Sequence, residues 1–445
     1  MALIELSPGT PAPPAAASPP PAYVYRRAGL LLAVVLLLAL GGAAPASAMI
    51  WRRNGLVPLP DDGDFQLFGG RLYTISFGAG PPRIRALTTD PVRELWTVTG
   101  PPGDEERPYY VSDAAGGVVM IRAAGATTVL DAKTGAVRWH TSNLVQRLGG
   151  DATGLLQQER FRPGTEYDPE SGDPGRLYGY AGDGLHTEPA LSTTLSGVDL
   201  GTGRRLWSAT IAGSVSTQAI GVREAFAVLS ADLLTVRSAG DGAVQRQRAM
   251  PRVDGRGPVW FEAIGDILLV HYGDFGQGGR VAAYAQDTLE PLWQRDEADP
   301  QGSAVACVAL PCARSRTEVA VLDPRTGAPL WRAGAGIDLS AFGTDAVLEA
   351  RSTSRPLRIA DRRTGKTRAD LRYWMTYTAS PGSDAYLVTR YESATRSTVT
   401  GLLRPGAAAV QPLGRIPDTN GECRLDDATV ACRVPHGIEI YHHLG

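Results

Sequence analysis

The chain has 445 residues, of which 43% are hydrophobic and 20% are charged, and its formal net charge at neutral pH is −2. A chain of this length can bury a large core. The 44 Lys and Arg residues nearly balance the 46 Asp and Glu residues and form no basic stripe. The composition therefore gives no support to nucleic-acid binding.

The first fifty residues differ in composition from the rest. Residues 1–25 are rich in Pro and Ala and nearly free of charge, which predicts a disordered tail. Arg26 and Arg27 then precede an uncharged segment, residues 28–50, which as a helix would span roughly 34 Å, enough for a bilayer.

We therefore predict that residues 1–25 are a cytoplasmic tail, 26–50 a transmembrane signal anchor and 51–63 a linker, with the remainder outside the cytoplasmic membrane. The alternative is a cleaved signal peptide, because Ala46-Ser47-Ala48 is an acceptable cleavage site. Cleavage after Ala48 would give a secreted protein.

A short unit at residues 129–139 has the pattern of a strand, a tight turn and a second strand. Asp131 ends the first strand and can accept hydrogen bonds from the amides of the turn, and Gly135 supplies the positive φ that a tight turn requires. The second strand carries Trp139, a large ring that is suited to burial against a neighbouring layer.

The same unit recurs along the chain. Four copies keep the pattern Asp-x-x-Thr-Gly, with the Asp and Gly residues Asp131 and Gly135, Asp199 and Gly203, Asp323 and Gly327, and Asp361 and Gly365. Full and shortened copies carry a following tryptophan, namely Trp96, Trp139, Trp207, Trp293 and Trp331. Trp96 and Trp139 are 43 residues apart, and Trp293 and Trp331 are 38 apart. A period near forty with short strands is typical of propeller blades.

This periodicity predicts an all-β fold, a β-propeller of eight four-stranded blades over residues 64–445. Seven blades is the alternative, because one weak module could be a decorated strand. A partial unit at residues 423–443 has strands but no following turn, and we expect it to pair with a strand from the other end and close the ring. The tryptophans, with the Asp and Gly residues of their turns, are expected to dock one blade on the next.

The D-x-x-T-G-x-x-x-W unit resembles the tryptophan-docking repeat of the pyrroloquinoline-quinone-like (PQQ-like) β-propeller family, which includes quinoprotein dehydrogenases and the bacterial assembly lipoprotein BamB. The resemblance covers residues 64–443. It implies the fold, but it does not imply a cofactor, because many members of the family bind none.

The resemblance leaves two kinds of function open. Quinoprotein dehydrogenases typically carry a vicinal Cys-Cys disulfide over the cofactor and an Asp/Glu/Asn set for Ca²⁺. This chain has no Cys-Cys dipeptide and three Asn residues. It also lacks the G-x-S-x-G, H-E-x-x-H and Walker patterns. We therefore expect no catalytic residue, metal or cofactor, and keep a PQQ-dependent dehydrogenase as the alternative.

The four cysteines form two close pairs in the sequence, Cys307 with Cys312 and Cys423 with Cys432. Local pairs in even number predict disulfides and an oxidising compartment. A zinc site is the alternative, although neither pair has C-x-x-C spacing.

One large insertion, residues 160–190, interrupts the third module. A long loop within a compact blade is often functional, and this one carries the aromatic residues Phe161, Tyr167, Tyr178 and Tyr180 together with Asp168. We predict that these five residues belong to a binding loop. A loop that only packs on its own blade is the alternative. Its carboxylates could also hold a cation, namely Glu166, Asp168, Glu170, Asp173 and Asp183.

The sequence therefore predicts a bacterial, membrane-tethered, extracytoplasmic propeller that acts as a non-catalytic scaffold. Its expected partners are the cytoplasmic membrane, through the N-terminal helix, and an envelope protein or glycan.

Overall fold

The computed structural model describes residues 51–443 except 79, 102–108, 115–116, 124, 149–151, 174–178, 182–183, 222–223, 274–278, 297–306, 352–354, 380–384 and 420. The chain divides into two units, Met1–Met49 and Ile50–Gly445. The predicted tail and signal anchor lie outside the described residues. Within the described part, no helix is long and apolar enough to cross a membrane.

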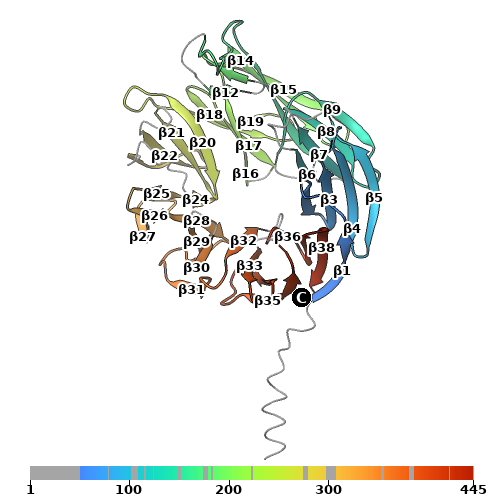
Figure 1. Cartoon of the computed structure of the whole chain (residues 1–445). Helices are drawn as coiled ribbons and strands as arrows, with labels where there is room; N and C mark the ends of the chain where they lie inside the picture. The colour runs from blue at the N-terminus through green and yellow to red at the C-terminus, as the bar shows by residue number, and fades with distance from the viewer. Residues whose placement is uncertain are drawn as a thin grey trace, which may run out of the picture. The chain divides into compact units, whose positions relative to one another are not determined.

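The second unit is a β-propeller of nine blades arranged around one axis (Figure 1). Blade 1 consists of β2 (Asp64–Phe68), β3 (Arg71–Ser76), β4 (Arg83–Thr89) and β5 (Val92–Thr99). Blade 2 consists of β6 (Tyr110–Ala114), β7 (Val118–Ala123), β8 (Ala126–Asp131) and β9 (Val137–Thr141). Blade 3 consists of β10 (Val145–Arg147), β11 (Thr153–Arg160), β14 (Ser192–Asp199) and β15 (Arg205–Ala212).

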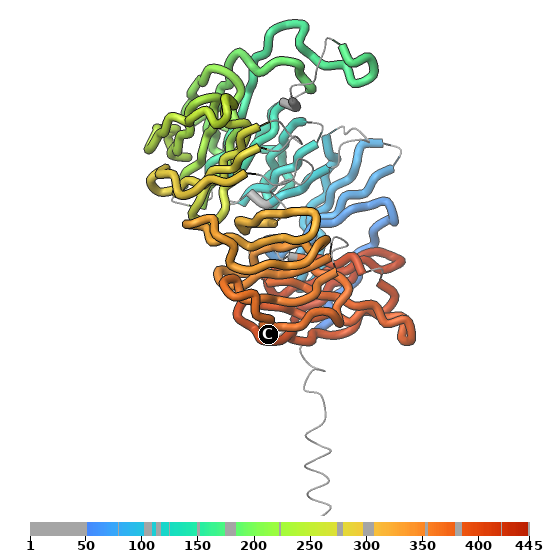
Figure 2. Tube along the Cα trace, turned by 90° about the vertical axis from the view of Figure 1, so that its left-hand side faces the viewer, coloured from blue at the N-terminus to red at the C-terminus, as the bar shows by residue number. Residues whose placement is uncertain are grey.

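The next three blades continue in chain order around the ring, as the colour gradient in Figure 2 shows. Blade 4 consists of β16 (Ser216–Ile220), β17 (Ala225–Leu229), β18 (Leu233–Ser238) and β19 (Val244–Ala249). Blade 5 consists of β20 (Pro258–Ile264), β21 (Ile267–Tyr272), β22 (Arg280–Ala285) and β23 (Pro291–Asp296). Blade 6 has three described strands, β25 (Cys312–Arg314), β26 (Glu318–Leu322) and β27 (Pro329–Gly334).

The last three blades bring the chain back to its start. Blade 7 consists of β28 (Ile337–Phe342), β29 (Ala346–Arg351), β30 (Arg355–Asp361) and β31 (Thr367–Asp370), and β24 (Cys307–Val308) pairs with β28 in parallel. Blade 8 consists of β32 (Thr376–Ala379), β33 (Tyr386–Glu392), β34 (Ser397–Leu403) and β35 (Gln411–Pro417). Blade 9 consists of β36 (Cys423–Asp426), β37 (Thr429–Val434), β38 (Gly437–His443) and β1 (Trp51–Val57).

The blade count corrects the prediction of eight, or possibly seven. The partial unit at residues 423–443 supplies three strands, and β1 pairs antiparallel with β38 to complete a four-stranded sheet. The expected pairing between the two ends is therefore present, but it creates a ninth blade instead of completing an eighth. Strand β1 lies in the segment 51–63, for which we predicted a linker, so the propeller begins before residue 64.

The core lies between neighbouring blades. Inner and middle strands are buried on both faces, as in β17 and β21, where every residue is buried. Outer strands alternate or are largely exposed, as in β19. In one cluster, Ile84 and Trp96 of blade 1 pack with Val119 and Ile121 of blade 2. Burial of such side chains, at about 1.5–3 kcal/mol each, is what holds successive sheets together.

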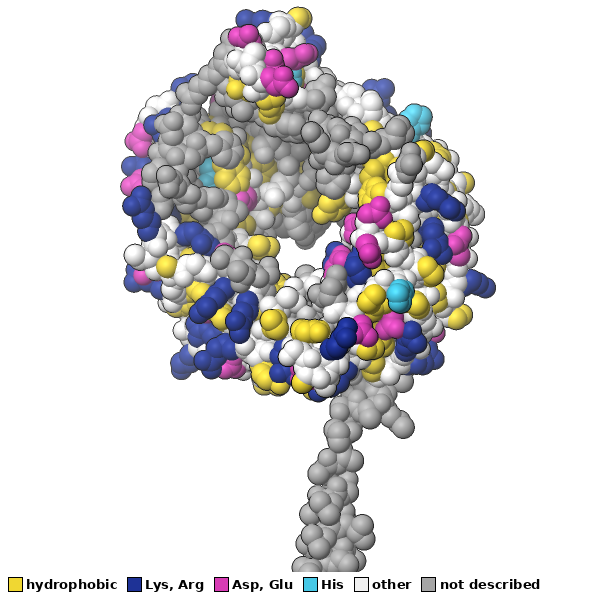
Figure 3. Space-filling view, in the orientation of Figure 1, with side chains coloured by type: hydrophobic (Ala, Val, Ile, Leu, Met, Phe, Trp, Pro, Cys, Tyr) yellow, Lys and Arg dark blue, Asp and Glu magenta, His cyan; other side chains and the backbone are white. Residues whose placement is uncertain are grey.

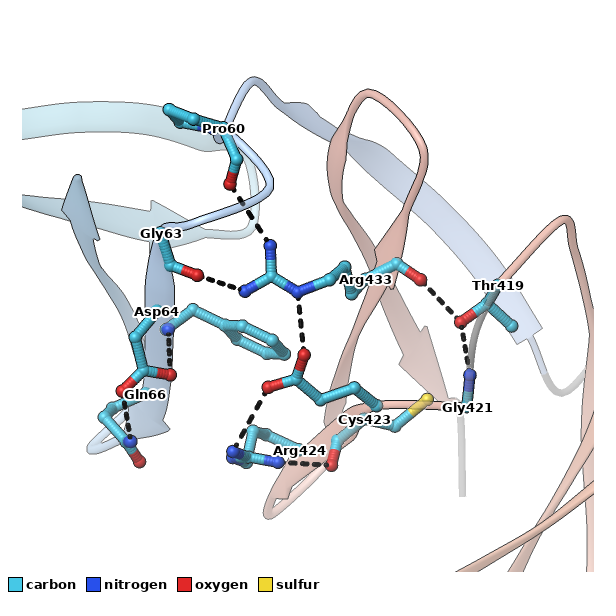
Figure 4. A network of polar contacts seen from close by, with 11 residues as sticks. Pro60, Gly63, Asp64, Gln66, Thr419, Gly421, Cys423, Arg424 and Arg433 are labelled. Atoms are coloured by element: carbon cyan, nitrogen blue, oxygen red, sulfur yellow. Dashed lines mark hydrogen bonds and ion pairs between the residues drawn. The ribbon is translucent and has the colours of Figure 1, made fainter. Parts of the chain in front are cut away.

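A polar network reinforces the interface where blade 9 meets blade 1 (Figure 4). The Arg433 guanidinium donates to a Glu422 carboxylate oxygen at 2.7 Å and to the Gly63 carbonyl at 2.5 Å. It also lies over the Phe65 ring, 5.5 Å from the centroid. Because Gly63 and Phe65 come from the N-terminal end, this one side chain links the two ends of the propeller.

Candidate functional site

Five tryptophans on the outer strands bridge successive blades. Each donates its indole N–H to a backbone carbonyl of the following blade. The pairs are Trp96 with Ala132 at 3.0 Å, Trp139 with Leu200 at 2.8 Å, Trp207 with Ala239 at 2.8 Å, Trp293 with Pro324 at 2.9 Å, and Trp331 with Arg362 at 2.9 Å. These tryptophans lie at blade interfaces and belong to the scaffold.

The turn that receives each ring requires a glycine for two reasons. Gly203 has φ +71°, and a Cβ placed on it would lie 2.7 Å from the Trp139 ring. Gly135 has φ +72°, and its Cβ would lie 2.7 Å from the Trp96 ring. A side chain at either position would therefore be strained and would also collide with the docked indole.

The Asp of each turn holds the backbone that accepts the ring. Asp131 Oδ1 accepts the amide N–H groups of Lys133 and Thr134, both at 2.9 Å, and Arg138 donates to Oδ2 at 2.6 Å. The bond from Arg138, followed by the bonds from the turn amides, holds the pKa of Asp131 well below its usual range. Asp361 has the same arrangement with Arg368, and its pKa is lowered for the same reason. Asp199 and Asp323 accept equivalent turn amides.

Four of the nine blade interfaces lack this tryptophan–glycine contact, and each has different residues in its place. Between blades 4 and 5, Arg246 occupies the tryptophan position and Leu289, at φ +59°, occupies the glycine position. Between blades 9 and 1, the Asn54 side-chain amide donates to the Thr89 carbonyl at 2.8 Å.

At the interfaces between blades 7 and 8 and between blades 8 and 9, the tryptophan ring comes from another position in the sequence. Ala369 occupies the tryptophan position of blade 7, and Trp374 packs over Gly401 of blade 8. Trp51 of β1 packs over Gly414 of blade 8 and stacks on Tyr441 at 4.6 Å between centroids.

The cysteines form the two predicted disulfides, Cys307–Cys312 and Cys423–Cys432. Cys423 and Cys432 are directly opposite each other on β36 and β37, and both side chains are buried. The zinc alternative is therefore wrong for both pairs.

The insertion in blade 3 folds as a small structure of its own. Its base is closed where the Leu191 N–H donates to the Arg160 carbonyl at 2.8 Å. Strands β12 (Gly179–Ala181) and β13 (Gly184–His186) pair within it. The Tyr167 N–H donates to the Leu185 carbonyl at 2.8 Å, which ties the two arms together. In Figure 1 the insertion, marked by β12, extends beyond the ring of blades.

The predicted loop residues have different environments. Phe161 stacks on the buried His186, with ring centroids 3.6 Å apart, so this ring packs within the insertion. Tyr167 is half-buried. Tyr178 lies outside the described residues, and for Tyr180 only the backbone, in β12, is described. The Phe161 ring therefore packs inside the insertion, and among the described residues the exposed side chains include Glu166, Asp168 and Glu170.

Asp168 organises the tip of the insertion. Its carboxylate accepts the Glu170 N–H at 2.8 Å and the Ser171 hydroxyl at 2.7 Å, and the bond from Ser171, then that from Glu170, lowers its pKa. Glu166, Glu170 and Asp173 are exposed around it. Among the described residues, no group of three His, Cys, Asp or Glu side chains could hold a metal ion. Asp183, the fifth carboxylate of the suggested cation site, lies outside them.

A second surface was not anticipated from the sequence. A groove of about 590 Å³ lies between β27 of blade 6 and the strands β28–β30 of blade 7. Arg332, Arg351, Arg355 and Arg358 line it. The sequence did contain a signal for this groove. Residues 314–372 include twelve Lys and Arg but only seven Asp and Glu, in a chain whose net charge is −2.

Comparison with known proteins gives one match to a sequence family, whose model is described as outer membrane protein assembly factor BamB. Residues 191–364 match this family model. The match covers blades 4–6, with adjoining strands of blades 3 and 7, and includes the Asp199, Asp323 and Asp361 turns. No curated protein sequence matches the chain.

The chain also matches solved structures of low sequence identity. BamB from Moraxella catarrhalis is 12% identical with a TM-score of 0.39, covering 88% of this chain and 100% of that one. A eukaryotic initiation factor is 13% identical with a TM-score of 0.47, covering 81% and 91%. A europium-containing methanol dehydrogenase is 11% identical with a TM-score of 0.38, covering 79% and 84%.

Proposed function

We propose that this chain is a non-catalytic binding scaffold of the cell envelope, anchored by residues 26–50 with its propeller outside the cytoplasmic membrane. The observation that carries the proposal is the insertion of blade 3. It is built out from a rigid ring, is closed at its base by the bond from Leu191 to Arg160, and has its own sheet. Loops that a rigid scaffold holds in place are where binding residues tend to collect.

The chemistry of the insertion favours a protein partner with a basic surface. Glu166, Glu170 and Asp173 are exposed around the turn that Asp168 holds. Arg162, a nearby cation, is paired with Glu188 at 3.6 Å. In Figure 3, Asp and Glu side chains lie on the part that projects from the ring, together with Lys and Arg side chains. Such charge steers association with an oppositely charged partner and makes it sensitive to salt.

Deletion of the insertion tests this function. Arg160 and Ser192 are directly opposite on β11 and β14, so an Asn-Gly turn can replace residues 161–191 and close a regular hairpin. We expect the thermal transition to change little, while capture of the envelope protein bound by the intact chain is lost. Capture that survives the deletion would place the binding surface elsewhere.

A charge variant separates recognition from folding. Glu166→Gln, Glu170→Gln and Asp173→Asn together remove exposed charge and leave the turn of Asp168 in place. We expect partner capture at low salt to fall at least tenfold, with no change in melting temperature. Asp287→Asn with Glu290→Gln, both exposed on blade 5, is the matched control and should bind normally. Quinone-dependent dye reduction by the purified chain would instead favour the dehydrogenase alternative.

A further inference from the structure

The basic groove between blades 6 and 7 has features of a built anion site. Figure 3 shows Lys and Arg side chains gathered over the region labelled β25–β31 in Figure 1. The groove lies where the connection from β27 to β28 meets the hairpin end of β29 and β30. At about 590 Å³ it has the size of a small-molecule site.

Two of the arginines oppose one another at the hairpin end. Arg351 on β29 and Arg355 on β30 are directly opposite in the register, so their side chains leave the same face of the sheet. Both are exposed, and among the described residues no carboxylate pairs with either. Like charges directly opposite are destabilising in an antiparallel pair. An anion between the two guanidinium groups would relieve that repulsion.

The floor of the groove is fixed by a buried ion pair. Glu349 is 5% exposed, and its carboxylate accepts from Arg358 at 2.5 Å. Arg358 also donates to the Gly365 carbonyl and to the Thr367 hydroxyl, and it lies 6.0 Å from the centroid of the Trp331 ring. The buried carboxylate of Glu349 is therefore paired with Arg358 and does not neutralise Arg351 or Arg355.

The opposite wall carries a further cation. Arg332 on β27 is 59% exposed and contacts Glu318 at 2.9 Å, on the surface of blade 6. An exposed pair of this kind contributes little energy, so Arg332 can turn to a ligand at small cost. Three exposed arginines, from three strands and two blades, thus line one groove.

We propose that this groove binds the phosphate group of a phosphorylated ligand, with Arg351 and Arg355 as its principal contacts and Arg332 completing the site from blade 6. Guanidinium groups form bidentate bonds to phosphate oxygens, and clusters of arginine are the usual means of recognising phosphate. A carboxylate has two oxygens and is satisfied by one bidentate guanidinium group, whereas a phosphate has enough oxygens to bind three arginines. The site is separate from the insertion, so it stands whether or not the insertion captures a protein.

The test uses the purified full-length chain with inorganic phosphate as the probe, and chloride at equal ionic strength as the reference. Phosphate should raise the melting temperature in a saturable manner. Arg355→Gln should weaken the apparent affinity about tenfold, the loss expected for a hydrogen bond between charged groups. Arg351→Gln with Arg355→Gln should abolish the shift. Arg93→Gln, an exposed arginine on β5, is the matched control and should keep it.

A second readout separates binding from folding. Without phosphate, the double variant should melt at the same or a higher temperature than the parent, because the opposed charges are gone. The proposal is overturned if phosphate gives no saturable shift, or if the double variant retains the shift.

Two further binding experiments distinguish a lipid headgroup from a soluble ligand as the source of the phosphate. One uses vesicles of phosphatidylcholine with and without phosphatidic acid, and the other uses free glycerol 3-phosphate. Arginine-dependent binding to the acidic vesicles alone assigns a lipid headgroup, and a response to glycerol phosphate assigns a soluble ligand. A response to neither overturns the proposal.

Discussion

The contact between Trp139 and Gly203 predicts a strong coupling between two residues of neighbouring blades. In the parent chain, Gly203→Ala adds a Cβ that lies 2.7 Å from the indole ring at a backbone φ of +71°. The left-handed backbone costs roughly 1 kcal/mol, and the collision adds about 1–3 kcal/mol. The expected loss of unfolding free energy is therefore about 2–4 kcal/mol.

Removing the ring should remove the collision. Trp139→Ala alone should lower the unfolding free energy by about 2–4 kcal/mol. The half-buried ring contributes less than a fully buried one, and the lost hydrogen bond to the Leu200 carbonyl adds to the cost. Adding Gly203→Ala to that variant should cost only the backbone strain. The double variant should therefore be about 1–3 kcal/mol more stable than the sum of the single effects.

Gly406 supplies a matched control for this cycle. It is the glycine of the corresponding turn in blade 8, with φ +79° and nothing within 4 Å of a Cβ. The preceding blade carries Ala369 at the position where five other blades carry tryptophan. Gly406→Ala should therefore cost roughly 1 kcal/mol, the strain alone. Urea unfolding of the parent chain and these four variants is the assay. If Gly203→Ala is as mild as Gly406→Ala, or if the cycle is additive, the docking contact does not carry the assigned energy.

Four further predictions concern closure, acid stability, disulfides and topology. Arg433→Gln should lower unfolding free energy by about 2–4 kcal/mol in urea, because it leaves Glu422 without its strongest partner, while the more exposed Arg424→Gln should cost about 1 kcal/mol; equal effects would refute the closure role. Asp131 and Asp361 have lowered pKa values, so the stability they supply is complete above about pH 4 and is lost as the pH falls below it. A double Asp→Asn variant should therefore show a shallower loss of melting temperature between pH 4 and pH 2. Replacing Cys423 and Cys432 by Ser should cost about 2–3 kcal/mol, and native reduction should leave their disulfide intact because both are buried. Protease added to intact protoplasts should digest the chain beyond Asp61, and protection would contradict the proposed topology.

The repeat could be recognised from the sequence because its signal is local. Asp131, Thr134 and Gly135 make their turn with one another, so five neighbouring residues suffice to predict it. The partner of each ring could not be assigned in the same way, because Trp139 contacts Leu200 and Gly203 only after two blades have formed.

The ninth blade was missed for a similar reason. Strand β1 begins Trp51-Arg52-Arg53-Asn54 and has no alternating apolar pattern. Its identity as a strand comes from pairing with β38 and from Trp51 stacking on Tyr441.

The two proposed binding surfaces show what residue composition alone cannot predict. Phe161 was expected at an interface because of its residue type, but its ring stacks on His186 inside the insertion. Arg351 and Arg355 are unremarkable as single surface residues. They oppose one another only once the register of β29 and β30 is set, and that register cannot be read from the residues alone.

The pairing of β1 with β38 has a consequence for how the chain reaches its native state. Trp51 is opposite His443, so the first strand of the propeller finds its partner only after the eight intervening blades and β38 have been synthesised. Contacts so distant in sequence form late and slowly. Until then, β1 has an unpaired edge, which is a site for association with other chains. Loss of β38 would leave β1 without its partner and the ring open, so a product truncated before Gly437 should aggregate or be degraded.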